Sequence, residues 1–251
     1  MPKETHSDSD EYSGENSYSD DGSYSSNSNA LSDLSSSSTM PALFSVQTDA
    51  CSGDYDRIEL LIRQAKTLNV LDITENDKMA LFSKIVVRSE AESIDAEPWI
   101  TSFFSLMEYA QVRRMLHPKV CGAIEKVAGH KEMNLLISAR FSNVPEEVVF
   151  EMYEALPEIS AKAGGRQLML LSLEKPVGKE EEKEIHAVFP TFKFASSAKL
   201  FPVNTEDIFL ILGKKKPVFV CPMSNNAVIK GYVLDKADLN EFIAAMREYY
   251  V

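Results

Sequence analysis

Cysteine and histidine, the residues that most often carry out chemistry in proteins, are few in this chain and lie far apart. Its three cysteines and four histidines are Cys51, Cys121, Cys221, His6, His117, His130 and His186. Zinc sites need such ligands at short spacing, and neither a Cys-x-x-Cys nor a His-x-x-x-His segment occurs. A cysteine–histidine pair that meets only in the folded chain stays open, although Cys221 beside Pro222 is typical of a small apolar residue at a strand end. We therefore predict no metal centre and no catalytic cysteine.

Glycines spaced to hold a phosphate are also missing. A phosphate-binding loop needs closely spaced glycines, because backbone N–H groups must approach the anion. The only adjacent pair is Gly164-Gly165, and no Gly-x-Gly segment occurs. This pair lies between a predicted helix and a predicted strand, where a simple chain turn explains it. We predict no cofactor.

Charge is concentrated at the N-terminus. The chain has a net charge of −12, and residues 1–40 hold eight acidic residues against one lysine. This serine-rich and acidic segment has almost nothing apolar to bury, so we predict a disordered tail over 1–40 and a single domain over 41–251. An acidic chain repels nucleic-acid phosphates and favours a basic partner protein, although the acidity could also serve solubility alone. The tail residues predicted to bind that partner are Asp8, Asp10, Glu11, Asp20 and Asp21.

Cellular context follows from three further features of the sequence. The sparse, odd number of cysteines favours a reducing compartment. The acidic, polar N-terminus does not have the pattern of a secretory signal, and no run of 18 apolar residues occurs. We expect an intracellular monomer with no membrane partner. Lys214, Lys215 and Lys216 form a predicted turn, and such a basic run can also act as a weak nuclear-import signal.

Helical patterns are more frequent in the first part of the chain and strand patterns in the second. We predict strands over residues 42–47, 99–107, 133–140, 167–173, within 184–194, 207–212, 218–221 and 228–234. We predict helices over residues 55–68, 74–85 and 112–127, the last with an interruption at Pro118. We also predict a helix from Pro145 to about 156, ended by Pro157, and one over 237–250 with Asp235 as its cap. Residues 179–184 are predicted to form an exposed loop. Because strands and helices do not alternate, a mixed, largely antiparallel central sheet covered by helices fits this α/β pattern best.

Several short segments resemble the BCCIP family. One runs from Ile137 to Pro145 (Ile-Ser-Ala-Arg-Phe-Ser-Asn-Val-Pro) and is followed by Met152-Tyr153; the family commonly has Glu where this chain has Ala139. Asp54-Tyr55-Asp56 resembles an early family motif, and Cys221-Pro222-Met223 resembles its Val-Pro-Met. The chain lacks most of the family's long acidic insert before Trp99. The matches run in patches from about Phe44 to the C-terminus.

The resemblance implies a fold like that of the GNAT acetyltransferases, without their activity. Those enzymes bind coenzyme A through an Arg/Gln-x-x-Gly-x-Gly/Ala loop, which this sequence lacks. The resemblance to the BCCIP family also implies a nuclear protein that guards a basic ribosomal protein during ribosome biogenesis and can shuttle to the cytoplasm. The family-motif positions Arg140, Phe141, Asn143 and Pro145 are predicted to be structural, with the Phe141 ring in the core. Two alternatives stay open: a degenerate acyltransferase, and a cell-cycle or DNA-repair scaffold.

Overall fold

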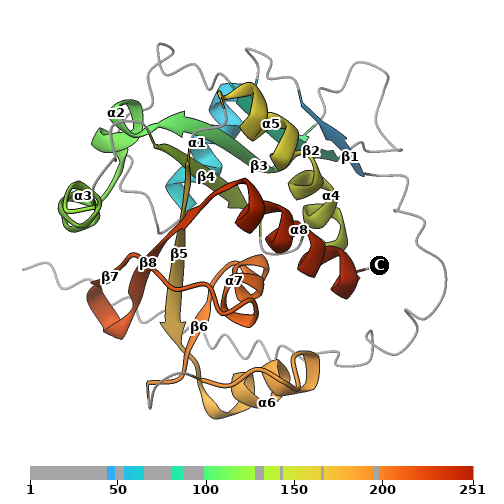
Figure 1. Ribbon diagram of the computed structural model, residues 1–251. Coiled ribbons are helices and arrows are strands. Elements are labelled where there is room, and N and C mark those ends of the chain that lie inside the picture. The colour runs from blue at the N-terminus through green and yellow to red at the C-terminus, as the bar shows by residue number, and fades with distance from the viewer. Residues whose placement is uncertain are drawn as a thin grey trace, which may run out of the picture. The chain divides into compact units, whose positions relative to one another are not determined.

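The computed structural model describes residues 44–48, 54–64, 81–87, 99–127, 133–141, 144–164, 167–194 and 198–250 (Figure 1). Its strands are β1 (Phe44–Gln47), β2 (Leu81–Val87), β3 (Trp99–Glu108), β4 (Asn134–Arg140), β5 (Leu168–Pro176), β6 (Leu200–Pro202), β7 (Phe219–Pro222) and β8 (Val228–Leu234). Its helices are α1 (Tyr55–Gln64), α2 (Tyr109–Val112), α3 (Pro118–Glu125), α4 (Glu146–Glu154), α5 (Leu156–Lys162), α6 (Lys179–Val188), α7 (Ile208–Leu212) and α8 (Lys236–Tyr250). No helix among these residues is long and apolar enough to cross a membrane.

All the described strands belong to one sheet with the order β1-β2-β3-β4-β5-β8-β7, and β6 pairs with part of β5. Every pairing is antiparallel except that of β4 with β5. The first four strands are neighbours both in the chain and in the sheet, as expected for successive antiparallel connections. The predicted fold class, a mixed and largely antiparallel sheet covered by helices, is therefore confirmed.

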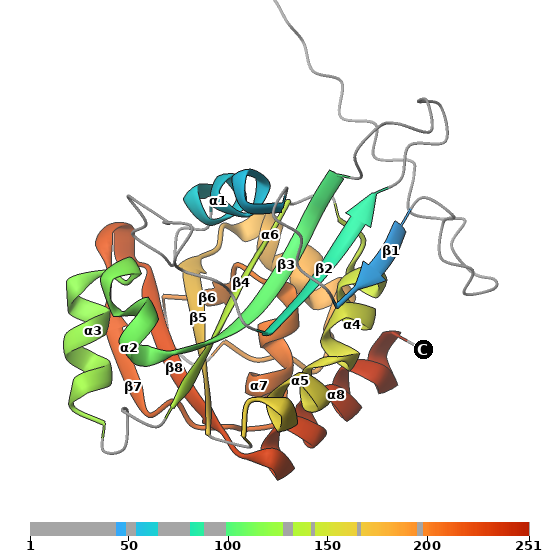
Figure 2. The same ribbon diagram turned by 90° about the horizontal axis from the view of Figure 1, so that it is seen from above.

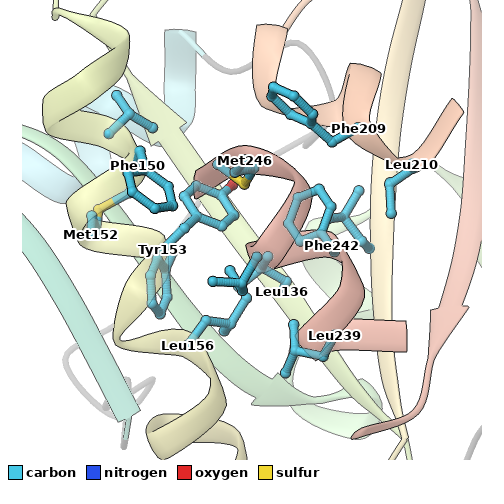
Figure 3. Packing of buried hydrophobic residues seen from close by; sticks show 14 of the residues in the cluster. Leu136, Phe150, Met152, Tyr153, Leu156, Phe209, Leu210, Leu239, Phe242 and Met246 are labelled. Carbon is cyan, nitrogen blue, oxygen red and sulfur yellow. The ribbon is translucent and has the colours of Figure 1, made fainter. Parts of the chain in front are cut away.

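Helices cover both faces of the sheet, with α1 and α3 on one side and α4, α5 and α8 on the other (Figure 2). Neighbouring residues of one strand point to opposite faces, so Phe103 and Leu135 enter the core under α1 and α3, while Phe104 and Leu136 enter the other. Figure 3 shows this second core, in which Tyr153 of α4 lies among side chains of α7 and α8. Each sheet face is thus buried by its own layer of helices.

The C-terminal part of the fold follows the sequence pattern closely. The predicted strand over 228–234 is β8, and the predicted closing helix is α8. The Asp235 Oδ1 atom accepts a hydrogen bond from the Asp238 N–H at 2.9 Å, and the Asp238 Oδ2 atom accepts one from the Asp235 N–H at 3.1 Å. This reciprocal cap satisfies two N–H groups that the helix itself leaves unpaired, as predicted.

Two predicted strands are in fact helices. Residues 207–212 form a short 3-10 turn and α7, because an unbroken apolar run such as Ile208–Leu212 has no period that separates a buried strand from a buried helix. Residues 179–188 form α6, where a loop and then a strand were expected. The Glu181 Oε2 atom caps this helix by accepting from the Gly178 N–H at 2.6 Å, and Ile185 is its buried contact.

One predicted helix was wrong in part. Residues 81–87 form β2, for which the β-branched run Ile85-Val86-Val87 is typical. Residues 65–80, which held the rest of two predicted helices, lie outside the described residues. The helix predicted from Pro145 is α4, and it ends at Glu154, shortly before Pro157 as predicted. A second helix, α5, follows at once and has Pro157 in its first turn, where a missing N–H costs nothing. Pro118 similarly begins α3 and separates it from α2.

Candidate functional site

The sheet opens between β4 and β5. These two strands pair in parallel only from Asn134 to Leu136 on β4 and from Leu168 to Leu170 on β5. Beyond that point β5 pairs with β6 on the same side, where Glu174 lies opposite Pro202. A functional site is expected in the gap that begins where the two strands separate, because the backbone hydrogen bonds between β4 and β5 are missing there.

Arg140, at the end of β4, lies in this gap and pairs with Glu206. The Nη2 atom of Arg140 is 3.2 Å from the Oε2 atom of Glu206, and the two side chains are only 13% and 4% exposed. The hydroxyl of Tyr153 donates a hydrogen bond to the Oε1 atom of Glu206 at 3.3 Å. Glu206 therefore holds together β4, α4 and the turn before α7, three segments that no backbone ladder joins.

The neighbouring carboxyl group, Asp207, is in a different electrostatic state. It is 2% exposed. Burial raises its pKa well above the usual value, and the charge of Glu206 raises it further. Two adjacent buried carboxyl groups disfavour double ionisation, so this raised pKa favours the protonated form of Asp207. Burial also raises the pKa of Tyr153, which keeps its hydroxyl as a neutral donor.

Two more polar contacts surround the gap. The Lys230 Nζ atom of β8 lies 2.7 Å from the Oε2 atom of Glu174 on β5, and Glu174 is 1% exposed. At the start of α4, the Glu146 Oε2 atom accepts a hydrogen bond from the Tyr250 hydroxyl at 2.9 Å. We use the term buried polar network for Arg140, Glu146, Tyr153, Glu174, Glu206, Asp207, Lys230 and Tyr250. Some of its polar atoms are not satisfied within the network: Glu174 Oε1, Glu206 Oε2 and Asp207 Oδ2 are buried without a hydrogen-bond partner among the described residues.

The family-motif positions fall next to this network. Arg140 belongs to it, and Pro145 is the residue that precedes the first turn of α4. Phe141 is half-buried and packs against both cores, so its ring lies at the junction of the two faces. Asn143 lies outside the described residues, as do the tail positions Asp8, Asp10, Glu11, Asp20 and Asp21.

Sequence reasoning missed Glu206 and Asp207. Both lie in a segment predicted to border or begin a strand, and acidic residues in a connecting segment are usually exposed. No local pattern distinguishes them from the many other acids of this chain. The one usable signal was Tyr153 in the family segment, since a buried tyrosine needs a partner for its hydroxyl.

The cysteines and histidines that the structure describes have structural surroundings. The Nδ1 atom of His117 accepts from the Lys119 N–H at 3.2 Å and so caps α3. Cys221 is buried, and the Cys121 thiol donates to the Arg113 carbonyl at 3.2 Å. Burial raises the pKa of Cys121, which disfavours the reactive thiolate. Within the described residues no group of acids, cysteines or histidines could hold a metal ion.

Exposed carboxylates line the outer side of α4 and α5. Glu147, Glu151 and Glu154 are exposed on α4, where their spacing of four and three residues places them in one row, and Glu158 is exposed on α5. We call these four residues the acidic stripe. Glu154 pairs with Arg247 of α8 at 2.8 Å, and Glu158 pairs with Lys162 at 2.8 Å. Partial burial, together with the charge of Glu154, raises the pKa of Glu151.

Comparison by sequence found no match, and comparison by structure found solved chains of low identity. No family model and no curated protein matches the chain. The structure is similar to that of BCP1 from Saccharomyces cerevisiae, a BCCIP-family protein, at 15% identity and a TM-score of 0.48, over 82% of this chain and 88% of that one. It is also similar to an N-acetyltransferase from Staphylococcus aureus Mu50 at 12% identity and a TM-score of 0.37, over 77% and 98% of the two chains. A third similar structure is that of FeeM, an N-acyl amino acid synthase from uncultured soil microbes. It is 9% identical, with a TM-score of 0.42, over 82% of this chain and 97% of that one.

Proposed function

We propose that this chain is a binding protein and not an enzyme. Its client would be a basic protein of the large ribosomal subunit, which it would guard in the nucleus and accompany during ribosome biogenesis while shuttling to the cytoplasm. The observation that supports the proposal is that Arg140, the cation at the gap between β4 and β5, is paired with Glu206, which also accepts a hydrogen bond from Tyr153. The ribosomal identity of the client rests on the BCCIP-like segments of the sequence.

The start of α4 is poorly suited to a coenzyme with a pyrophosphate group. A helix N-terminus attracts anions through its unpaired N–H groups and its dipole. Here Glu146 and Glu147 already place two carboxylates in the first turn. Arg140, the nearby cation that could have met a phosphate, is paired with Glu206 instead. A pyrophosphate would therefore meet repulsion where it needs attraction.

The acidic stripe suits a basic client. Like charges at helical spacing repel one another, and the charge of Glu154 adds to the effect of partial burial in raising the pKa of Glu151. A lysine- or arginine-rich surface would replace the repulsion with attraction and would be drawn to the stripe from a distance. The acidic tail of residues 1–40, with its eight acids, would add to the same long-range field.

Co-purification at low salt followed by binding kinetics tests the proposal. We expect a basic ribosomal protein among the retained partners, and an association rate that falls as salt rises, because the Debye length shrinks from about 10 Å at 0.1 M to about 3 Å at 1 M. Glu147→Lys with Glu151→Lys should slow association about tenfold. The matched control is Glu180→Lys with Glu184→Lys on exposed positions of α6, which changes net charge equally. Partners that are mainly acidic or bound through RNA would contradict the proposal and favour the scaffold alternative.

A thermal-shift titration with acetyl-coenzyme A tests the acyltransferase alternative. A ligand that binds only the folded state must raise the melting temperature, by an amount that grows with its concentration. We expect no shift for the unmodified chain at millimolar coenzyme. A saturable rise that disappears when Arg140 is changed to Met would place the coenzyme in the gap and would contradict the binding-protein proposal.

A further inference from the structure

The last strand in the sheet order, β7, has an outer edge with no partner among the described residues. On its inner edge the Met223 N–H donates to the Ala227 carbonyl at 2.8 Å, and Cys221 lies opposite Ile229. Because hydrogen-bonded pairs alternate along an antiparallel ladder, the pairing residues of β7 are Phe219 and Cys221. The N–H and C=O of Val220 therefore point outward, away from β8.

One face of β7 is bare and the other is covered. Cys221 is 6% exposed and packs with Phe219 in the core under α3, whereas Val218 and Val220 are 45% and 51% exposed. Val218 precedes β7, and its N–H donates inward to the Gly231 carbonyl at 2.8 Å, so the outward peptide group at this edge is that of Val220. An outward-pointing peptide group therefore lies beside half-exposed β-branched side chains, which is the arrangement to which an added strand binds.

A basic turn and an apolar cavity adjoin this strand. Lys214 and Lys216 are exposed and have no carboxylate partner among the described residues, whereas Lys215 pairs with Asp238. The three lysines line a cavity of about 420 Å³ whose apolar walls include Leu210, Val218 and Phe242. Val218 thus belongs both to the cavity and to the bare face. In a chain of net charge −12, this turn is a place where an acidic ligand would be attracted.

Prolines limit what the edge can accept. Pro217 and Pro222 border β7, and proline at an edge is a common protection against open-ended strand pairing. That protection explains why the edge is short. Protection of the edge gives no reason for two lysines without a carboxylate partner among the described residues. The cavity beside them is also lined by Asp238, which pairs with Lys215, and by Glu241, so an acidic segment would contact Lys214 and Lys216 and place its apolar side chain in the cavity.

We propose that the β7 surface, defined as Lys214, Lys216, Val218, Val220 and the adjoining cavity, binds a short extended acidic segment of a partner protein. The segment pairs with the N–H and C=O of Val220 and inserts an apolar side chain into the cavity. Its carboxylates lie against Lys214 and Lys216. This surface has the opposite charge to the acidic stripe, so the chain could hold this partner and a basic client at the same time.

Fluorescence anisotropy with a defined peptide tests the charge and cavity contacts. The probe is a fluorescein-labelled Glu-Asp-Val-Leu-Val-Asp-Glu peptide, and its counterpart has lysine at every acidic position. We expect saturable binding of the acidic peptide only, weakened about tenfold or more by Lys214→Glu with Lys216→Glu. The matched control is Lys119→Glu with Lys126→Glu on the exposed side of α3, which should change affinity less than about twofold. No saturable binding, or equal loss in both variants, would overturn the proposal.

Val220→Pro tests the added strand itself. Proline removes the outward N–H of Val220 and leaves the bonds between β7 and β8 in place, so the fold should persist while peptide affinity falls at least about fivefold. Val220→Thr keeps the N–H and should bind normally. Unchanged binding by a folded Val220→Pro variant would overturn strand addition. Sedimentation equilibrium of the protein alone provides a second check, because a dimer that Val220→Pro dissociates would show that a second copy occupies this edge instead.

Discussion

The two edges of β5 are held by different kinds of interaction. On one edge, β5 pairs with β8 from Leu168 to Glu174 without interruption. On the other, it pairs with β4 only from Leu168 to Leu170 and with β6 from Glu174 to Pro176. Where β4 has left β5, Arg140, Glu206 and Tyr153 join β4, the turn before α7 and α4. Where the ladder is complete, the backbone N–H and C=O groups pair with one another, and apolar side chains are enough to hold the strands together. Where it ends, buried charged and polar side chains join the segments, and each one depends on its partner.

Removing Glu206 should have the largest effect. Glu206→Ala leaves Arg140 buried without a counter-charge, so we expect a loss of about 3–5 kcal/mol in the free energy of unfolding. Chemical denaturation measures this loss. The double change Arg140→Met with Glu206→Leu should recover most of it, because an apolar pair carries no desolvation cost. A single variant as stable as the parent would show that the gap is held by something other than this ion pair.

Phe141→Ala tests the junction where β4 leaves the sheet. The ring packs against both cores, so its loss should cost about 3 kcal/mol, the lower end of the range for a buried aromatic side chain because Phe141 is half-buried. Denaturation and partner binding should be measured on the same preparation. If the variant is fully stable and fails only to bind its partner, Phe141 belongs to an interface and not to the core.

Gly231→Ala tests the side of the sheet where the ladder is complete. A Cβ atom on Gly231 would lie 2.2 Å from the Cε1 atom of Phe219, so the ring must leave its place over β8. We expect a loss of about 1–3 kcal/mol, as for overpacked sites. Gly122→Ala in α3 is the matched control, since its Cβ would meet nothing within 4 Å. That change should stabilise the protein by about 0.5–1 kcal/mol, because alanine is the better helix former.

Asp207→Asn should have the smallest effect, and one that depends on pH. The folded-state pKa of Asp207 is raised above the usual 3.8, so its favourable contribution is complete below that pH and is lost as pH rises through the folded value. Asparagine cannot ionise, so the variant does not lose stability in this way as pH rises. The melting temperature of the variant relative to the parent should therefore rise from pH 4 to pH 8. A constant difference would show that Asp207 does not titrate in this way.

Local sequence patterns predicted those parts of the fold that local interactions determine. The alternating residues of β8 and the Asp235–Asp238 cap specify their structures within a few neighbouring positions, and both were found as expected. The segment Ile208–Leu212 was wrongly predicted to be a strand, because its uniformly apolar side chains fit a buried strand and a buried helix equally well. The buried polar network could not be predicted, since the burial of Glu206 depends on where β4 and β5 separate, and that is decided by segments far apart in the chain.

The sheet order also has a consequence for synthesis on the ribosome. The strands β1 to β4 find their sheet neighbours soon after they emerge, whereas β5 must wait for β8, which is among the last segments to be made. Until then the apolar strand Leu168–Leu173 has an open edge, and closing such a long loop is slow. Nascent chains halted between β5 and β8 should therefore be the most prone to aggregate. This chain would itself need protection from aggregation in the interval between the synthesis of β5 and that of β8.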